Sequence, residues 1–234
     1  MDTLVKSIAV ILARGGSKRL PRKNILDFGG KPMLAWSVEA AIDSGCFDRV
    51  LVSTDDEEIA AIGKRYGAEV PFLRQAAADD MSPSSEATLA AVDQAENFWF
   101  ESYQLVAQLM ANCPLRNKAD IRDACDHFNA SSARAQISCF RYGWMNPWWA
   151  TKLDENGRPH YLFEEARGMR SQDLPPLYCP TGAIWLARLD ALREARSFYT
   201  PDCSFHPMPW LSALDIDDAE DMQMARACLS LKNY

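Results

Sequence analysis

The sequence feature that most constrains the fold is an apolar run that stops at a glycine pair and continues into a cationic segment. The run IAVILAR begins at Ile8 and is followed directly by Gly15 and Gly16. Five cations occur within ten residues, namely Arg14, Lys18, Arg19, Arg22 and Lys23. Glycines let backbone N–H groups approach an anion, and cations neutralise its charge. The pattern predicts a polyphosphate site at the carboxyl end of a buried strand.

The spacing of this segment excludes two common nucleotide motifs. Gly-Gly-Ser-Lys does not fit GxxxxGK[ST], and it does not fit the dinucleotide fingerprint GxGxxG. We therefore expect long cationic side chains to hold the phosphates, with Arg14 as a planar fork and Lys18 and Lys23 as point charges. A solvated surface cluster is the alternative, but it would not need a buried strand and a Gly-Gly turn before it.

Strand and helix patterns alternate along the chain. β-Branched and apolar runs predict strands at residues 7–12, 49–54, 69–73, 104–110, 135–140 and 182–186. Apolar residues at helical spacing predict helices at residues 34–42, 57–66, 84–98, 118–128 and 219–231. Thr54 and Asp55 before Glu57 and Glu58 resemble a capping box, and residues 213–217 are expected to be extended. The alternation predicts an α/β fold with a Rossmann-like, mostly parallel sheet flanked by helices.

The alternation of strand and helix patterns is interrupted between residues 142 and 176. This segment contains Trp144, Trp148 and Trp149, a hairpin signal at Asn156-Gly157, and a proline pair. We interpret residues 1–234 as one domain, with 142–176 as a small antiparallel excursion that projects from the sheet.

Composition excludes several classes of protein. The formal net charge of −7 argues against a nucleic-acid partner. The early apolar run of six residues is far shorter than the roughly 20 that a membrane span needs, so we expect no membrane association and a cytoplasmic protein. Seven scattered cysteines without a Cys-x-x-Cys pair indicate neither a disulfide framework nor a zinc site.

Four segments carry a resemblance to a known family. The runs LARGGSKRLPRKN, VSTDDEEIAAIGKRYGA, YCPTGAIWL and LDIDDAEDM occur in this order over nearly the whole chain. Together they resemble the acylneuraminate cytidylyltransferases, the CMP-sialic acid synthetases and their bacterial relatives. The resemblance implies transfer of CMP from CTP to the anomeric hydroxyl of a nonulosonic acid, with Mg²⁺ and a homodimer exchanging its excursions.

The same resemblance implies roles for individual residues. The loop would contact CTP through Ala13, Arg14, Gly15, Gly16, Lys18, Lys23 and Asn24, with Arg14, Lys18, Lys23 and Asp215 as the catalytic set. Arg74 resembles an arginine near the nucleotide, and Ser84 a serine that contacts cytidine. Ser82 is an alternative to Ser84, which would otherwise be an ordinary helix N-cap.

Two aspartates are the acidic counterpart of the loop. In an extended Asp-Ile-Asp, Asp215 and Asp217 face the same side, so both carboxylates can reach one Mg²⁺ ion. The resemblance gives them that metal-binding role. The alternative is that Asp217 and Asp218 cap the final helix.

The residues that would contact the acceptor sugar depart from the family pattern. Met110 stands where sialic acid synthetases have a glutamine, with Asn112 two residues later, and Cys179 stands where arginine is frequent. We therefore expect a modified acceptor of the pseudaminic or legionaminic type, contacted by Met110, Asn112, Arg170 and Gln172, rather than N-acetylneuraminate. The alternatives are a cytidylyltransferase for 3-deoxy-octulosonic acid and a non-catalytic nucleotide-binding regulator.

Overall fold

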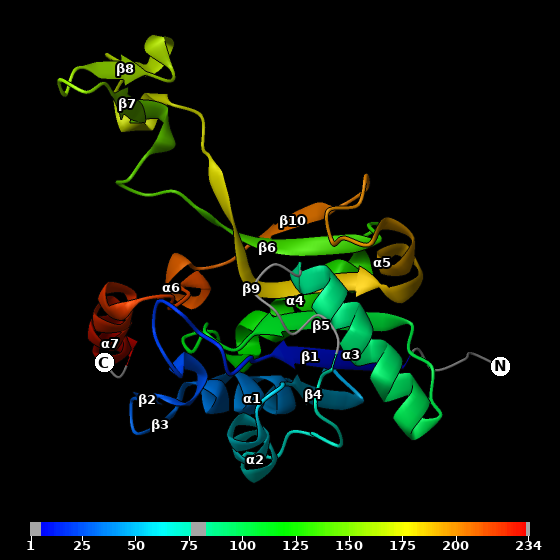
Figure 1. Cartoon of the computed structure of the whole chain (residues 1–234). Helices are drawn as coiled ribbons and strands as arrows, with labels where there is room; N and C mark the ends of the chain where they lie inside the picture. Colours follow the sequence, from blue (N-terminus) through cyan, green and yellow to red (C-terminus); the bar gives the residue numbers. More distant parts are fainter. Residues whose placement is uncertain (1–5, 76–82, 233–234) are drawn as a thin grey trace.

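A six-stranded sheet forms the centre of the protein (Figure 1). The structure is a computed structural model that describes residues 6–75 and 83–232. The strands lie in the order β10-β6-β9-β5-β1-β4. Their bounds are Ser7–Leu12 for β1, Arg49–Ser53 for β4, Leu105–Met110 for β5, Ala135–Arg141 for β6, Tyr178–Arg188 for β9 and Ser204–Pro207 for β10.

Most neighbouring strands in this sheet are parallel. β1 pairs in parallel with both β4 and β5, and β10 pairs in parallel with β6. β9 lies between β5 and β6 and is antiparallel to both. The predicted mostly parallel α/β fold is confirmed. Because β9 runs in reverse, its first residues lie at the same end of the sheet as the last residues of β5 and β6.

Helices cover both faces of the sheet, so β1 is buried on both sides. Ile8 and Val10 pack into one cluster, and Ala9 and Ile11 pack into the other. The Ala9 face is covered by α1 (Met33–Ser44), α2 (Glu57–Arg65) and α4 (Lys118–Ala130). The Ile8 face is covered by α3 (Ser84–Trp99) and α5 (Leu189–Ala195). A strand buried on both faces reads as an unbroken apolar run, which is the pattern found at residues 8–13.

A third apolar cluster closes one end of the sheet. It joins the short hairpin of β2 (Asp27–Phe28) and β3 (Lys31–Pro32) to the last helix, α7 (Ala219–Lys232). The one-turn helix α6 (Trp210–Ala213) precedes the segment that leads into α7. Ile216 in this segment is fully buried in the cluster, which fixes the chain on either side of it.

Residues 142–176 form an arm that reaches away from the sheet (Figure 1). The arm holds the two-stranded ribbon of β7 (Thr151–Leu153) and β8 (Pro159–Tyr161), with short 3₁₀ turns η2 (Pro147–Trp149), η3 (Glu164–Ala166) and η4 (Ser171–Asp173). Gly157 has φ +76° in the turn, so the hairpin predicted at Asn156-Gly157 is confirmed. The rings of Trp148 and Phe163 lie 4.9 Å apart and supply the arm's own packing.

Several local predictions were wrong. The strand expected at 69–73 is a single bridge between Leu51 and Glu69. The cap of α2 is Asp56, whose carboxylate accepts from the N–H groups of Glu58 and Ile59, rather than Thr54 or Asp55. Residues 214–217 join no strand, and β10, the β2–β3 hairpin and α5 were not foreseen. Short pairs like these depend on their neighbours in space and leave little local signal.

Within the part of the chain that the structure describes, none of the helices combines the length and apolar character required to cross a bilayer.

The turn between β2 and β3 provides a matched test of packing. Gly29 and Gly30 both have positive φ, +64° and +90°. A Cβ on Gly29 would lie 2.4 Å from Cδ2 of Leu229 and 3.3 Å from Cζ2 of Trp36, whereas one on Gly30 would meet nothing within 4 Å. We expect Gly30→Ala to cost about 1 kcal/mol for its backbone, and Gly29→Ala a further ~1–3 kcal/mol for overpacking. Denaturant unfolding measures both, and equal losses would contradict the packing of α7 on this turn.

Candidate active site

Four chain segments meet at the end of the sheet where the parallel strands finish. The cationic loop after β1 approaches the end of β4, with the N–H of Ala13 donating to the carbonyl of Ser53 at 3.1 Å. The segment before α7 approaches the end of β5, with the N–H of Ile216 donating to the carbonyl of Asn112 at 2.9 Å. Ligands of open α/β sheets bind at this edge, outside the carboxyl ends of the strands.

Acidic residues at the start of α2 anchor the loop. The N–H of Gly15 donates to Oδ1 of Asp55 at 3.0 Å, and Arg22 Nη1 binds Oδ2 of Asp56 at 2.8 Å. Arg22 also pairs with Glu58 and has a left-handed backbone, φ +60°. Arg22 therefore braces the loop, and its charge is directed at α2 instead of at the phosphate pocket.

Space is tighter at the first glycine of the pair than at the second. A Cβ on Gly15 would lie 2.7 Å from Oδ2 of Asp56, while one on Gly16 would meet nothing within 4 Å. The short 3₁₀ turn η1 (Lys23–Ile25) ends the loop, and Nδ2 of Asn24 donates to the carbonyl of Arg14 at 3.0 Å. Asn24 is thus buried beneath the loop and holds its shape from inside.

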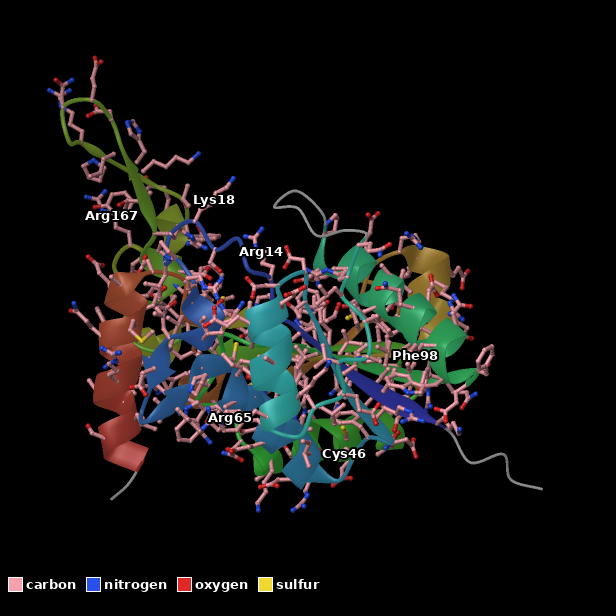
Figure 2. All side chains as sticks on the ribbon, turned by 60° about the horizontal axis from the view of Figure 1, so that its bottom comes forward. Arg14, Lys18, Cys46, Arg65, Phe98 and Arg167 are labelled. Atoms are coloured by element: carbon pink, nitrogen blue, oxygen red, sulfur yellow. The ribbon has the colours of Figure 1, made fainter. Side chains whose placement is uncertain are left out.

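Cations from this loop line a pocket of about 270 Å³. Its lining residues are Arg14, Ser17, Lys18, Arg19, Leu20, Lys23 and Asp217. Four of the five cations singled out in the sequence meet here, and Figure 2 shows Arg14 and Lys18 extending from the loop. The concentration of positive charge around one small pocket suits the phosphates of a nucleotide.

Arg74 lies behind the loop. It is nearly buried, and its Nη1 donates to the carbonyl of Ser53 at 3.3 Å and to its Oγ at 3.4 Å, while Nε has no partner among the described residues. Burial lowers the pKa of Arg74; the charge of Arg14 lowers it further, against the opposite effect of Asp55. Arg74 is not among the residues that line the pocket, and it adds positive charge behind Arg14, which does line it.

Ser84 is the first residue of α3, and Pro83 is its N-cap. The alternative interpretation of Ser84 as an ordinary helix N-cap is therefore wrong. Ser84 is half-buried and is not among the residues lining the cationic pocket. Ser82, the alternative to Ser84, lies outside the described residues.

The two aspartates before α7 lie at the end of the sheet where the loop lies, and Asp217 is half-buried. Ile216 between them is buried, so the side chains of Asp215 and Asp217 both lie away from the apolar cluster. Asp217 accepts from Lys23 Nζ at 2.6 Å, from Arg19 Nη2 and from Asn112 Nδ2 at 3.2 Å. The loop and the acidic segment are therefore joined by ion pairs across the pocket.

The pKa values of the two aspartates move in opposite directions. Burial, with the neighbouring charge of Asp217, raises the pKa of Asp215. Burial would raise the pKa of Asp217 as well, but Lys23 and Arg19 more than offset it and hold that pKa below its usual range. The ionised form of Asp217 is thus stabilised by its cations. The ionised form of Asp215 is destabilised, and a bound cation would relieve that destabilisation.

Helix capping does not account for these carboxylates. Oδ1 of Asp218 accepts from the N–H groups of Glu220 and Asp221, at 2.9 and 3.0 Å. Oδ2 of Asp221 accepts from the N–H of Asp217 and of Asp218, at 2.9 and 3.1 Å. Asp218 and Asp221 therefore form the reciprocal cap of α7, and the Asp217 side chain is left to the cations.

The residues expected on the sugar side divide into two places. Met110 ends β5 next to Gly182, where a Cβ would lie only 2.9 Å from Cγ of Met110, so glycine makes room for the thioether. Asn112 is buried behind Asp217. Arg170 and Gln172 lie on the arm, where Arg170 pairs with Asp173 at 2.7 Å. The structure does not bring Arg170 and Gln172 to the pocket of their own chain.

Sequence reasoning missed two arginines. Arg19 was counted among the cations without a role, although it binds Asp217. Arg116 is fully buried and donates through Nη1 to the carbonyls of Met110 and Ala183. Arg116 ties β5 to β9 beside the site, and its only sequence signal was its place at the end of the stretch 110–116, which was compared with a family motif.

Comparison with known proteins identifies the family. The profile of the cytidylyltransferase family matches residues 8–156. A pseudaminic acid cytidylyltransferase of Campylobacter jejuni (serotype O:23/36, strain 81-176) is 36% identical, with 95% of each chain covered. The chain belongs to the cytidylyltransferase family. It is a CTP-dependent nucleotidyltransferase.

Two further comparisons agree with this assignment. A CMP-N,N'-diacetyllegionaminic acid synthase of Legionella pneumophila is 30% identical, over 97% of each chain. The solved structure of a CMP:2-keto-3-deoxy-manno-octonic acid synthetase with CTP superposes with a TM-score of 0.69 and 17% identity, covering 97% of this chain and 99% of that one. At this identity the second likeness shows a common fold and no more.

The opposite pKa shifts predict opposite effects of two matched substitutions on stability. The folded protein binds a proton at Asp215 more tightly than the unfolded chain does, so ionised Asp215 lowers stability above the unfolded pKa of about 3.9. Asp217 has the reverse linkage and stabilises the fold at neutral pH, an effect lost as the pH falls through its lowered pKa.

In EDTA at pH 7.5, we therefore expect Asp215→Asn to raise the melting temperature and Asp217→Asn to lower the free energy of unfolding by about 1–2 kcal/mol. Both differences should shrink near pH 3. Thermal and urea unfolding measure them, and a stabilised Asp217→Asn variant would refute the ion-pair assignment.

Proposed function

We propose that this cytidylyltransferase transfers CMP from CTP to the anomeric hydroxyl of a nonulosonic acid of the pseudaminic type. The observation that carries the proposal is the likeness to the Campylobacter pseudaminic acid enzyme over 95% of both chains, at 36% identity. The likeness to the legionaminic acid synthase, at 30%, supports the wider class of nonulosonic acids.

The chemistry is a nucleotidyl transfer. The anomeric oxygen forms a bond to the α-phosphorus of CTP, the bond from that phosphorus to the bridging oxygen breaks, and pyrophosphate leaves from the opposite side. Such a reaction depends chiefly on positioning and on neutralising charge. In this proposal Arg14, Lys18 and Lys23 hold the triphosphate, because these cations line the pocket.

The acidic segment fits a magnesium ion. Asp215 and Asp217 offer two carboxylates on one side of the chain. Among the described residues, no group of three or more His, Cys, Asp or Glu side chains could hold a metal ion. Mg²⁺ is commonly held by one or two carboxylates together with substrate phosphates and waters. When bound, the ion would neutralise phosphate charge and lower the pKa of the attacking hydroxyl. The raised pKa of Asp215 supports the proposal, since a cation there would relieve the repulsion between the carboxylates.

Met110 supports a modified acceptor. Its thioether stands next to Gly182, at the position where sialic acid synthetases use an amide. A site without that amide discriminates weakly for polar groups and suits a less hydroxylated sugar. The octulosonic acid alternative has only the common fold in its favour. The regulator alternative leaves Asp215 without a role, because neither the ion pairs of Asp217 nor the cap of α7 uses it.

Pyrophosphate release tests the acceptor. With CTP and Mg²⁺, we expect kcat/KM for a pseudaminic acid to exceed that for N-acetylneuraminate and for 3-deoxy-octulosonic acid by at least about 10-fold, since each lost polar contact is worth roughly a factor of ten or more. Asp215→Asn and the omission of Mg²⁺ are the controls, and both should abolish release. Comparable values for all three acids would overturn the acceptor assignment, and release by Asp215→Asn would overturn the metal assignment.

A homodimer built through the arm is part of the proposal. The arm exposes large apolar side chains, among them Trp144 (84% exposed), Leu153 (67%) and Met145 (64%). Large apolar and aromatic side chains of this kind are enriched in subunit interfaces. A second copy would also give Arg170 and Gln172 a route to an acceptor site that their own chain does not provide.

Gel filtration with light scattering tests the dimer. We expect a mass near twice 26.3 kDa at micromolar concentration, and a monomer for a Trp144→Ser/Leu153→Ser variant. Phe100→Ser is the matched control, because Phe100 is 93% exposed on the sheet domain outside the arm. A monomeric wild type would contradict the proposal.

We place the reaction in the cytoplasm. All seven cysteines lie within the described residues and carry free thiols, as is usual in a reducing compartment, and CTP is a cytoplasmic substrate.

A further inference from the structure

The acidic segment lacks the support that most active-site strands receive. Residues 214–217 belong to none of the sheets in the described part of the chain, although they carry both carboxylates of the site. Ile216 anchors the segment in the apolar cluster, but a buried side chain does not set the direction of its neighbours' carboxylates. Another contact must fix Asp217 relative to the end of β5.

Asn112 makes that contact from both its backbone and its side chain. Its carbonyl accepts from the N–H of Ile216 at 2.9 Å, and its Nδ2 donates to the carbonyl of Ile216 at 3.1 Å. The same Nδ2 donates to Oδ1 of Asp217 at 3.2 Å. Asn112 is only 4% exposed, so these bonds form where water does not compete.

The other partners of Asp217 are of a different kind. Lys23 and Arg19 bind it as cations, and both also line the pocket that suits a triphosphate. A dication at Asp217 would repel these two side chains, and phosphate oxygens would attract them. Asn112 is neutral and buried, so neither a metal ion nor a phosphate displaces it. It is the partner that stays with Asp217 when the ion pairs are exchanged.

We propose that Asn112 is a positioning residue that holds Asp217 in place for a divalent cation, and that its amide N–H groups do not contact the sugar. Its Nδ2 has two hydrogens and two acceptors, Ile216 and Asp217, which leaves no N–H to donate to an acceptor sugar. The inference rests on the proposed function in one respect, the role of Asp217 as a metal ligand.

The test compares Asn112→Leu with wild type by Mn²⁺ binding, measured by electron paramagnetic resonance with CTP present. Leucine keeps the shape of asparagine and removes the donor. We expect the Mn²⁺ affinity to fall about 10–100-fold, as is typical when a group orienting a metal ligand is lost. The activity should need correspondingly more metal, while KM for the sugar acid stays within about twofold. Asn129→Ala, an exposed change on α4, should match wild type.

Each other outcome contradicts the inference in a recognisable way. Unchanged Mn²⁺ affinity with a KM for the acid raised tenfold would make Asn112 a sugar contact. A lower melting temperature with unchanged metal affinity would reduce it to a structural brace. Asn112→Ala, a smaller change that also removes the donor, repeats the measurement if the leucine variant does not fold. If wild type binds no Mn²⁺ in the presence of CTP, the metal assignment in the proposed function is wrong. If wild type binds Mn²⁺, the affinity of the Asn112 variant tests the role of Asn112 alone.

Discussion

The ion pairing of Asp217 with Lys23 and Arg19 is the interaction on which the site depends. It joins a loop near the N-terminus to a segment near the C-terminus, 194 residues apart along the chain between Lys23 and Asp217. The pairing holds opposite charges at the edge of one pocket, ready for a ligand that carries both signs. In the proposed function this ligand is a nucleoside triphosphate with a divalent cation, whose phosphates would contact the loop and whose metal would contact the carboxylates.

The rest of the fold holds the cationic loop and the acidic segment in fixed positions relative to each other. β1 is buried on both faces, and it delivers the loop at a fixed point of the sheet. Asp55, Asp56 and Glu58 hold the loop from the start of α2, and Asp56 also caps that helix. On the opposite side, Asn112 holds the acidic segment against β5. Rigid elements thus supply the positioning that a transfer reaction requires.

The fold was largely predictable from sequence because its signals are local. An unbroken apolar run at β1 and helical spacing at α1 and α3 report burial directly, whatever the partners are. β10 was missed because Ser204–Pro207 becomes a strand only through its neighbour β6. The cap of α2 was displaced by one residue, to Asp56, since three polar residues in succession offer similar caps.

The site was less predictable than the fold, because side-chain partners are set by three-dimensional contacts. The loop cations and the two aspartates were found from residue type and spacing. The role of Arg22 as a brace was not, since its carboxylate partners lie 34 and 36 residues away along the chain. Asn112 was assigned to the sugar by its place after β5, whereas its amide is engaged by Ile216 and Asp217.

The antiparallel course of β9 has a mechanical consequence. This strand of 11 residues begins where the arm ends and runs through the sheet between β5 and β6. Gly182, which touches Met110, lies only four residues from its start at Tyr178. The arm is therefore joined directly to a strand that is held between two neighbours in the sheet. A neighbouring molecule that displaces the arm would therefore displace the first residues of β9, which lie beside the last residues of β6.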